Sequence, residues 1–401
     1  MKISLIQPGR NNLKYLKWSY DSIRKNQGNN EVEICVADDF SNDGTWDWCQ
    51  EMMKKDSSFK ALRNEGPTRL GHTILYDRLI NDLASHDVCM IYHADMYLCP
   101  GAIDAIEKEL KEKTIVSLTR IEPPLHPDGP EKILFDCGIE PEEFDEETLM
   151  AHLQMTSKDR LNKTTEGIFA PWAFYKKDFQ EIGGHDPLFA PQSKEDTDIF
   201  NRFQLNGINF IQTWEGCVYH MTCRGSRFAD GAKRNPDGNV FMKNRETDEW
   251  LAQNQRSTRN FTRKWGHFCS HDSLMKPVIP PKYDIGFVVK NCTQEILGAL
   301  EPWCDTIYAD ISAMAYIETE QSNTSFDLKS RIFGIHADIV NNVEVRFDAS
   351  RINQKDYDVL INISSVLKDS GGIGSFTVGN LELNIKSLAT HEKNLIKCFT
   401  L

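Results

Sequence analysis

Short apolar runs alternate with segments of helical periodicity along the first hundred residues of the chain. The apolar runs, which favour buried strands, cover residues 3–7, 32–37 and 88–92. Before the last run, Leu75, Leu79 and Leu83 recur four positions apart, as on one face of a helix over residues 70–84. Strands that alternate with helices predict an α/β fold, in which helices cover both faces of a mostly parallel sheet.

The same alternation returns near the end of the chain, after a proline-rich join at residues 276–281. We therefore predict one domain over residues 1–275 and a second, smaller α/β domain over residues 282–401. Within the second domain, Gly379-Asn380 lies between alternating flanks, which predicts a tight hairpin turn.

Composition narrows the class of protein further. Charged residues make up 26% of the 401 positions and hydrophobic residues 40%, which is typical of a globular chain. No apolar stretch reaches the ~18 residues of a membrane-spanning helix, so we expect no transmembrane segment. The net charge of -13, from 46 basic and 59 acidic residues, argues against a nucleic-acid partner. The eleven cysteines include no C-x-x-C pair and the N-terminus lacks a signal-peptide pattern, so we expect a reduced, cytoplasmic protein.

Polar residues follow the predicted strands at the point where each strand ends. Gln7 closes the first run, Asp38 and Asp39 follow the second, and His93 and Asp95 follow the third. Parallel strands end at one edge of their sheet, and ligands of such folds bind at that edge. We therefore expect these side chains to line one site.

Residues 38–45 read Asp-Asp-Phe-Ser-Asn-Asp-Gly-Thr between a predicted strand and a predicted helix. Helix capping explains one or two acids in such a string, but not a pair of carboxylates at a strand end. The string resembles the Asp-Asp-x-Ser-x-Asp-Gly-Thr element of the GT-A-fold glycosyltransferases of family 2. The resemblance implies a Rossmann-like GT-A sheet that binds a nucleotide sugar. The residues that it places around the base and ribose are Gln7, Pro8, Arg10, Asp38 and Asp39.

A second element, His93-Ala94-Asp95, matches the place of the family's Asp-x-Asp motif. The resemblance makes Asp95 a ligand of a divalent ion, Mn²⁺ or Mg²⁺, and places His93 and Ala94 against the nucleotide sugar. His93 departs from the family pattern because it replaces the first Asp. His220 stands where several family members have an additional metal ligand, so we assign it to the same ion. Hard ions of this kind keep phosphate oxygens in their coordination shell.

A third element, Glu195-Asp196-Thr197-Asp198, resembles the family's Glu-Asp-x-Asp motif at a helix start. A helix N-terminus favours carboxylates, which accounts for one acid but less well for three. In inverting members the second acid is the general base, which implies that role for Asp196, with Glu195 orienting the acceptor or the base. We assign Asp198 to helix capping or acceptor binding, and Trp172 to acceptor binding.

Residues 221–275 differ in charge from the rest of the chain, because they hold ten Lys and Arg against six Asp and Glu. We expect a basic, irregular extension, with a mobile lid over residues 221–240 that orders over the donor. Arg224 and Arg227 are spaced to approach a diphosphate, and Arg suits phosphate geometry through paired N–H donors. The alternative reading of these two residues is a solvated basic loop.

The motifs cover about residues 1–225 and imply an inverting, metal-dependent glycosyltransferase. It would move a sugar from a UDP- or GDP-linked donor to a hydroxyl of a glycan, lipid-linked or protein acceptor. We expect residues 282–401 to recognise the acceptor or to join copies of the chain in a homo-oligomer.

Two alternatives remain open. A sugar-1-phosphate nucleotidyltransferase would share this type of sheet, but residues 7–10 are too short and hold one Gly where that class has a glycine-rich basic loop. A non-catalytic module that binds a nucleotide sugar or glycan is favoured by His93 in place of the first Asp. Pyrophosphate release would indicate the first alternative, and donor binding without turnover would indicate the second.

Overall fold

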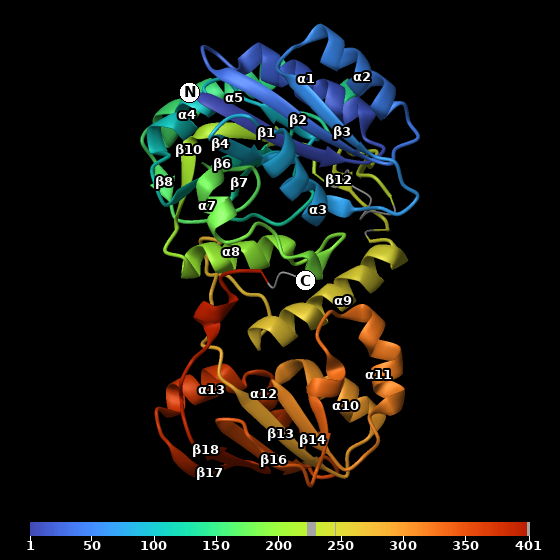
Figure 1. Cartoon of the computed structure of the whole chain (residues 1–401). Helices are drawn as coiled ribbons and strands as arrows, with labels where there is room; N and C mark the ends of the chain where they lie inside the picture. The colour runs from blue at the N-terminus through green and yellow to red at the C-terminus, as the bar shows by residue number, and fades with distance from the viewer. Residues whose placement is uncertain (223–229, 245, 399–401) are drawn as a thin grey trace. The chain divides into compact units, whose positions relative to one another are not determined.

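The computed structural model describes residues 1–222, 230–244 and 246–398 of the chain (Figure 1). The chain divides into two compact units. The first unit holds residues 1–195, 206–252 and 271–277, and the second holds residues 196–205, 253–270 and 278–401. Two segments that precede the proline-rich join are thus grouped with the C-terminal residues, and the predicted boundary between residues 275 and 282 stays a prediction. Within the described ranges, no helix is both long enough and apolar enough to cross a lipid bilayer.

The first unit is built on a ten-stranded sheet whose main path runs β3-β2-β1-β4-β9-β6-β10-β5. The strands of this path are β1 (Lys2–Gly9), β2 (Glu31–Asp39), β3 (Phe59–Asn64), β4 (Val88–Ile91), β5 (Met96–Leu98), β6 (Thr114–Glu122), β9 (Trp172–Tyr175) and β10 (Asn209–His220). Two short strands extend it, with β7 (Lys132–Leu134) beside β6 and β8 (Thr164–Thr165) beside β10. Strands β1 to β4 are parallel, as are β6 and β10, whereas β9 is antiparallel to both β4 and β6. The predicted α/β fold with a mostly parallel sheet is confirmed.

The helices of the first unit alternate with its strands along much of the chain, and the helix predicted over residues 70–84 is α-helical as far as Arg78. They are α1 (Leu13–Asn26), α2 (Thr45–Lys55), α3 (Gly71–Arg78), α4 (Ala102–Glu109), α5 (Glu146–Met155), α6 (Ser157–Arg160) and α7 (Lys176–Glu181). Helices α1 and α2 lie on one side of β1, β2 and β3, and α3 lies on the other (Figure 1). Because β1 is covered on both faces, its residues 3–8 are all buried, and the run is apolar rather than alternating. A separate pair, β11 (Lys233–Arg234) and β12 (Val240–Phe241), forms a small antiparallel ladder.

The second unit contains a six-stranded sheet in the order β15-β14-β13-β16-β18-β17. Its strands are β13 (Ile285–Lys290), β14 (Thr306–Ala309), β15 (Ile332–Gly334), β16 (Val343–Asp348), β17 (Gly374–Val378) and β18 (Leu381–Ile385). The first four are parallel, and β17 and β18 form an antiparallel hairpin at one edge. That hairpin turns at Gly379 and Asn380, as the sequence predicts.

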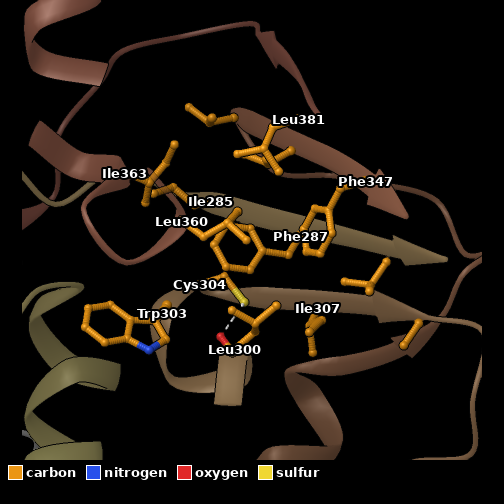
Figure 2. Close-up of a cluster of buried hydrophobic side chains, with 14 of the residues drawn as sticks. Ile285, Phe287, Leu300, Trp303, Cys304, Ile307, Phe347, Leu360, Ile363 and Leu381 are labelled. Atoms are coloured by element: carbon orange, nitrogen blue, oxygen red, sulfur yellow. Dashed lines mark hydrogen bonds between the residues drawn. The ribbon is translucent and has the colours of Figure 1, made fainter. Parts of the chain in front are cut away.

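The helices associated with the second unit are α8 (Glu195–Leu205), α9 (Asp248–Trp265), α10 (Gln294–Leu300), α11 (Met314–Glu320), α12 (Gln354–Ile361) and α13 (Ile363–Ser370). Helices α10 to α13 lie on one face of the sheet (Figure 1). On that face Phe287 packs edge-on against Phe347 at 6.1 Å between ring centroids, with Leu300 and Leu381 in the same buried cluster (Figure 2). The sheet's own helices therefore cover the buried apolar cluster on this face.

A buried ion cluster joins α9 to the sheet-bearing part of the second unit. Glu301 is 1% exposed and accepts hydrogen bonds from Arg263 Nε at 2.9 Å and from Arg331 Nε at 2.7 Å. Burial opposes the charge of Glu301, but Arg331 and Arg263 outweigh it and lower its pKa. Arg263 also pairs with Glu320 on α11. Because each charge in the cluster has a counter-charge, the cluster fixes α9 without leaving an uncompensated ion.

We expect Glu301→Gln to destabilise the second unit by about 3–5 kcal/mol, because it leaves two buried guanidinium groups short of a counter-charge. Urea unfolding should show the loss, with amide exchange on β13 and β16 reporting this unit separately. Arg351→Gln is the matched control, since Arg351 is 78% exposed and lies 3.9 Å from Asp348. The control should change stability by less than about 1 kcal/mol. Equal effects of the two substitutions would contradict a stabilising role of the buried cluster.

Candidate active site

Strand pairing brings Asp95 and His220 together in the first unit. Strand β4 ends at Ile91, and the chain reaches Asp95 just before β5 begins at Met96. Because β5 is antiparallel to β10, Met96 lies opposite His220, the last residue of β10. The carbonyl of Asp95 accepts a hydrogen bond from Met221 N at 3.0 Å, which holds the two strand ends side by side.

Three side chains converge at this point. Ligand-type atoms of His93, Asp95 and His220 all lie within 4.8 Å of one another. His220 Nε2 is 3.4 Å from Asp95 Oδ2, and the rings of the two histidines are 6.0 Å apart between centroids. The structure therefore groups the two predicted metal ligands and adds His93, which was expected to touch the nucleotide sugar, to the same cluster.

Glu122 contacts the ring of His220 on the side away from Asp95, and it was not among the predicted site residues. Strand β6 is parallel to β10 and pairs Ile121 with Tyr219, so Glu122 and His220 follow side by side at the strand ends. Glu122 Oε1 lies 2.7 Å from His220 Nδ1, which leaves Nε2 directed at Asp95. The signal for Glu122 was present in the sequence, since an acid at the end of an apolar run had already marked other site residues. Glu122 follows the apolar run at residues 115–121 in the same way.

Two cations balance the carboxylate of Glu122. Arg120 Nε is 3.0 Å from Oε1, and Lys132 Nζ is 3.6 Å from Oε2. The same two cations contact Glu131, each at 3.2 Å. Glu122 is 2% exposed, so these contacts compensate a charge that burial would otherwise disfavour.

The charge states of the cluster follow from burial and from its internal pairs. Burial would raise the pKa of Asp95, but the nearby His220 lowers it to about 2. Burial would likewise raise the pKa of Glu122, and its hydrogen bond with His220 lowers it to about 2. Burial lowers the pKa of His93 to about 3. Burial alone would lower the pKa of His220, but Asp95 and Glu122 raise that pKa to about 9.

These residues fit a divalent cation. At neutral pH the cluster offers one carboxylate and one neutral imidazole, and His220 can add a second imidazole after losing its proton. The Glu122 contact on Nδ1 is the outer-shell partner that metal-bound histidines usually have. Mg²⁺ prefers oxygen ligands, whereas imidazole suits transition metals, so the set fits Mn²⁺ better than Mg²⁺.

The two acids at the end of β2, Asp38 and Asp39, lie inside the unit. Asp39 is 2% exposed and accepts hydrogen bonds from the backbone N–H groups of Leu70 at 3.0 Å and Gly71 at 2.9 Å, so it holds the loop that leads into α3. Asp38 is fully buried, accepts from Ser41 N at 3.0 Å, and lies 3.3 Å from Arg63 Nε. Both carboxylates thus organise loops at the carboxyl edge of the sheet.

The other predicted donor-site residues lie at or near the same edge. Gln7 donates from Nε2 to Ser19 Oγ at 2.9 Å, and its buried Oε1 accepts no hydrogen bond within the described residues. Pro8 and Ala94 are buried, and Arg10 is half-buried. A nucleotide contact of these residues stays a prediction.

Two predicted acceptor residues present no surface to an acceptor. Trp172 is fully buried in β9, where it pairs with Ile91 of β4, and its ring packs on Phe174 at 4.7 Å. Asp198 in the second unit is also fully buried. It accepts hydrogen bonds from Arg202 Nε at 2.8 Å and Trp265 Nε1 at 2.9 Å, and it pairs with Lys264 Nζ at 2.6 Å. The acceptor assignment of both residues does not fit, and we reassign them to packing and charge compensation.

On the first turn of α8, the two predicted catalytic acids differ in exposure. Glu195 is 8% exposed, whereas Asp196 is exposed. An exposed carboxylate at a helix start can meet a substrate hydroxyl, which Asp198 cannot. The basic residues Arg224 and Arg227, with residues 223–229 of the predicted lid, lie outside the described residues.

Comparison with protein families finds a match to part of the chain. Residues 4–182 match the model of glycosyl transferase family 2. Among curated proteins, no sequence matches this chain.

Several solved structures are similar to part of the chain, each over 55% of its length. They are GalNAc-T7 with UDP, GalNAc and Mn²⁺ (14% identity, 43% of that chain, TM-score 0.41), the mannosyltransferase PcManGT from Pyrobaculum calidifontis with GDP-Man and Mn²⁺ (15%, 56%, 0.39), and S. aureus TarS 1-349 with UDP (15%, 60%, 0.40). The matched region thus spans about half the length of these proteins. The family match covers residues 4–182, less than half of the chain, and includes the strands β1 to β4 and the first two motifs described above.

Proposed function

We propose that this chain is an inverting, metal-dependent glycosyltransferase that moves a sugar from a UDP- or GDP-linked donor to an acceptor hydroxyl. The observation that carries the proposal is the cluster of His93, Asp95 and His220 at the carboxyl edge of a family 2 domain, with Glu122 fixing His220. The proposed acceptor is a glycan, a lipid-linked group or a protein.

In this proposal Asp95, His220 and His93 hold Mn²⁺ or Mg²⁺, and the donor set favours Mn²⁺. When bound, the ion supplies positive charge next to the diphosphate that leaves the sugar. Glu122 accepts the Nδ1 proton of His220, so the ring stays in one tautomer and presents Nε2 to the site. Gln7, Pro8, Arg10 and Asp38 lie near the base and ribose of the donor.

The proposed general base is Asp196. Its support is the match of residues 195–198 to the family's Glu-Asp-x-Asp motif and its exposed position on the first turn of α8. Asp196 takes the proton of the acceptor hydroxyl as its oxygen attacks the anomeric carbon. The bond to the leaving diphosphate breaks on the opposite face, so a single displacement inverts that carbon.

Asp95→Ala removes the carboxylate of the proposed metal site. We expect the Mn²⁺-dependent part of UDP or GDP affinity to fall at least about tenfold in calorimetry, because the ion loses its charged protein ligand. Titrations without Mn²⁺ give the metal-independent part. Asp82→Ala is the control, since that aspartate is 65% exposed on the surface of the same unit. If Asp95→Ala bound nucleotide and Mn²⁺ as the unmodified chain does, the metal assignment would be wrong.

Glu122→Gln tests the support of His220 without touching the proposed ligand set. We expect Mn²⁺ affinity to fall about 10–100-fold, because the amide no longer stabilises the imidazole orientation and basicity as a carboxylate does. The matched control is Glu131→Gln, a buried acid that contacts the same Arg120 and Lys132. Titration of the metal alone should separate the two variants. A similar loss in both would mean that the ion network, rather than the His220 contact, matters.

Asp196→Asn keeps the size of the side chain but cannot accept a proton at neutral pH. We expect donor affinity to persist and sugar transfer to fall by about 10²–10⁴, the range for lost acid–base catalysis. Asp159→Asn, an exposed acid on the first turn of α6, serves as the control. NMR of the product should show the anomeric configuration opposite to that of the donor. Retained configuration would rule out the proposed single displacement.

A further inference from the structure

The sheet of the second unit ends in an open strand. Within the described residues, β17 pairs with β18 alone, so its outer side carries backbone groups without a ladder partner. The pairing of β17 with β18 runs from Gly374 to Val378 with no register shift, so no bulge twists the edge away. Such an edge is a template for another strand.

The edge strand and its flanking residues lack the charged side chains that are common elsewhere in the chain. Residues 370–381 include no charged side chain and no proline, although charged residues make up 26% of the sequence. Natural proteins protect open edges with lysine, proline or bulges, and β17 has none of these. The edge is therefore uncharged in a chain whose net charge is -13.

The apolar face of the sheet continues onto β17 beyond its helical cover. Phe376 pairs with Leu383 and Val378 with Leu381, so their side chains lie on the face that packs against the helices. Leu381 and Leu383 are 0% and 4% exposed, whereas Phe376 and Val378 are 41% and 37% exposed. Figure 2 shows Leu381 at one side of the buried cluster, and Leu381 pairs with Val378 of β17. On this face, the helices thus cover the side chains of β18 but leave those of β17 partly exposed.

The hairpin that carries this edge is held in place by α12. Asp356 accepts hydrogen bonds from Asn380 N at 3.0 Å through Oδ1 and from Asn380 Nδ2 at 2.8 Å through Oδ2. At the neighbouring turn residue Gly379, with φ of +58°, an added Cβ would lie 2.1 Å from Asp356 Oδ1. The turn is therefore fixed against the helix, and the edge strand is presented in one position.

We propose that β17 pairs antiparallel with β17 of a second copy of this chain, which joins two six-stranded sheets into one. A two-fold axis near Phe376 places each Phe376 opposite its copy and each Ser375 opposite Thr377. Aromatic pairs and Ser–Thr pairs stabilise adjacent antiparallel strands. A second copy is the occupant that this edge fits, because the strand is self-complementary under a two-fold axis and brings no like charges together.

Ser375→Lys/Thr377→Lys tests the pairing without weakening the hairpin. On β18 these residues face Asn384 and Glu382, so the new lysines meet an amide and an opposite charge inside the unit. Across the proposed interface each lysine meets another lysine, which opposes pairing. The matched control is Thr319→Lys/Ser325→Lys, which adds the same charge at exposed positions of the same unit.

Sedimentation of the full chain over a wide range of concentration measures the outcome. We expect a dimer that dissociates on dilution, persists in the control and is lost in Ser375→Lys/Thr377→Lys. Amide exchange at residues 374–378 should slow as concentration rises, in the unmodified chain and the control only. A monomer at every concentration, or a dimer that both variants retain, would overturn the proposal. Circular dichroism and nucleotide affinity, unchanged in both variants, would show that each chain is folded.

Discussion

Strand β10 pairs with β6 and with β5, and the position of the candidate metal ligands depends on both pairings. Its first part pairs with β6 up to Thr213, after which the register shifts and pairing resumes at Cys217. Gly216 lies in this interruption, where a Cβ would come within 2.6 Å of Leu118. Without the shift Cys217 would lie opposite Glu122, and His220 would run past the end of β6. The bulge therefore places His220 beside Glu122, while the pairing of β10 with β5 places it beside Asp95.

Buried carboxylates in both units are each compensated by two cations, at least one of which comes from another part of the chain. Glu122 has Arg120 and Lys132, Asp198 has Arg202 and Lys264, and Glu301 has Arg263 and Arg331. Such groups fix geometry more than they add stability, since removal of one partner leaves a buried charge. In the first unit that geometry orients a candidate metal ligand. In the second it fixes helices α8 and α9 to the elements around them.

The acids of the family motifs serve two purposes. Asp39 accepts from a backbone N–H group at the start of α3, and Asp43 accepts from backbone N–H groups at the starts of α2 and α1, as capping residues do. Asp95 instead keeps its carboxylate at the site, next to two imidazoles. A motif string therefore predicts where the carboxyl edge of the sheet lies more reliably than it predicts which carboxylate meets a ligand. The two kinds of acid differ in burial and in whether backbone N–H groups of the same unit donate hydrogen bonds to them. The motif string reveals neither property.

The sequence by itself determined the class of fold, the hairpin at Gly379-Asn380 and the places where strands end in polar residues. Those features depend on local periodicity and turn chemistry, which act over a few residues. Only the tertiary structure added Glu122 and His93 to the cluster of Asp95 and His220, and removed Trp172 and Asp198 from the acceptor residues. Each of these depends on pairing between distant segments: the register of β10, the insertion of β9 between β4 and β6, and the contact of α9 with Asp198. Contacts of that kind join residues that are far apart in the chain, so no local pattern encodes them.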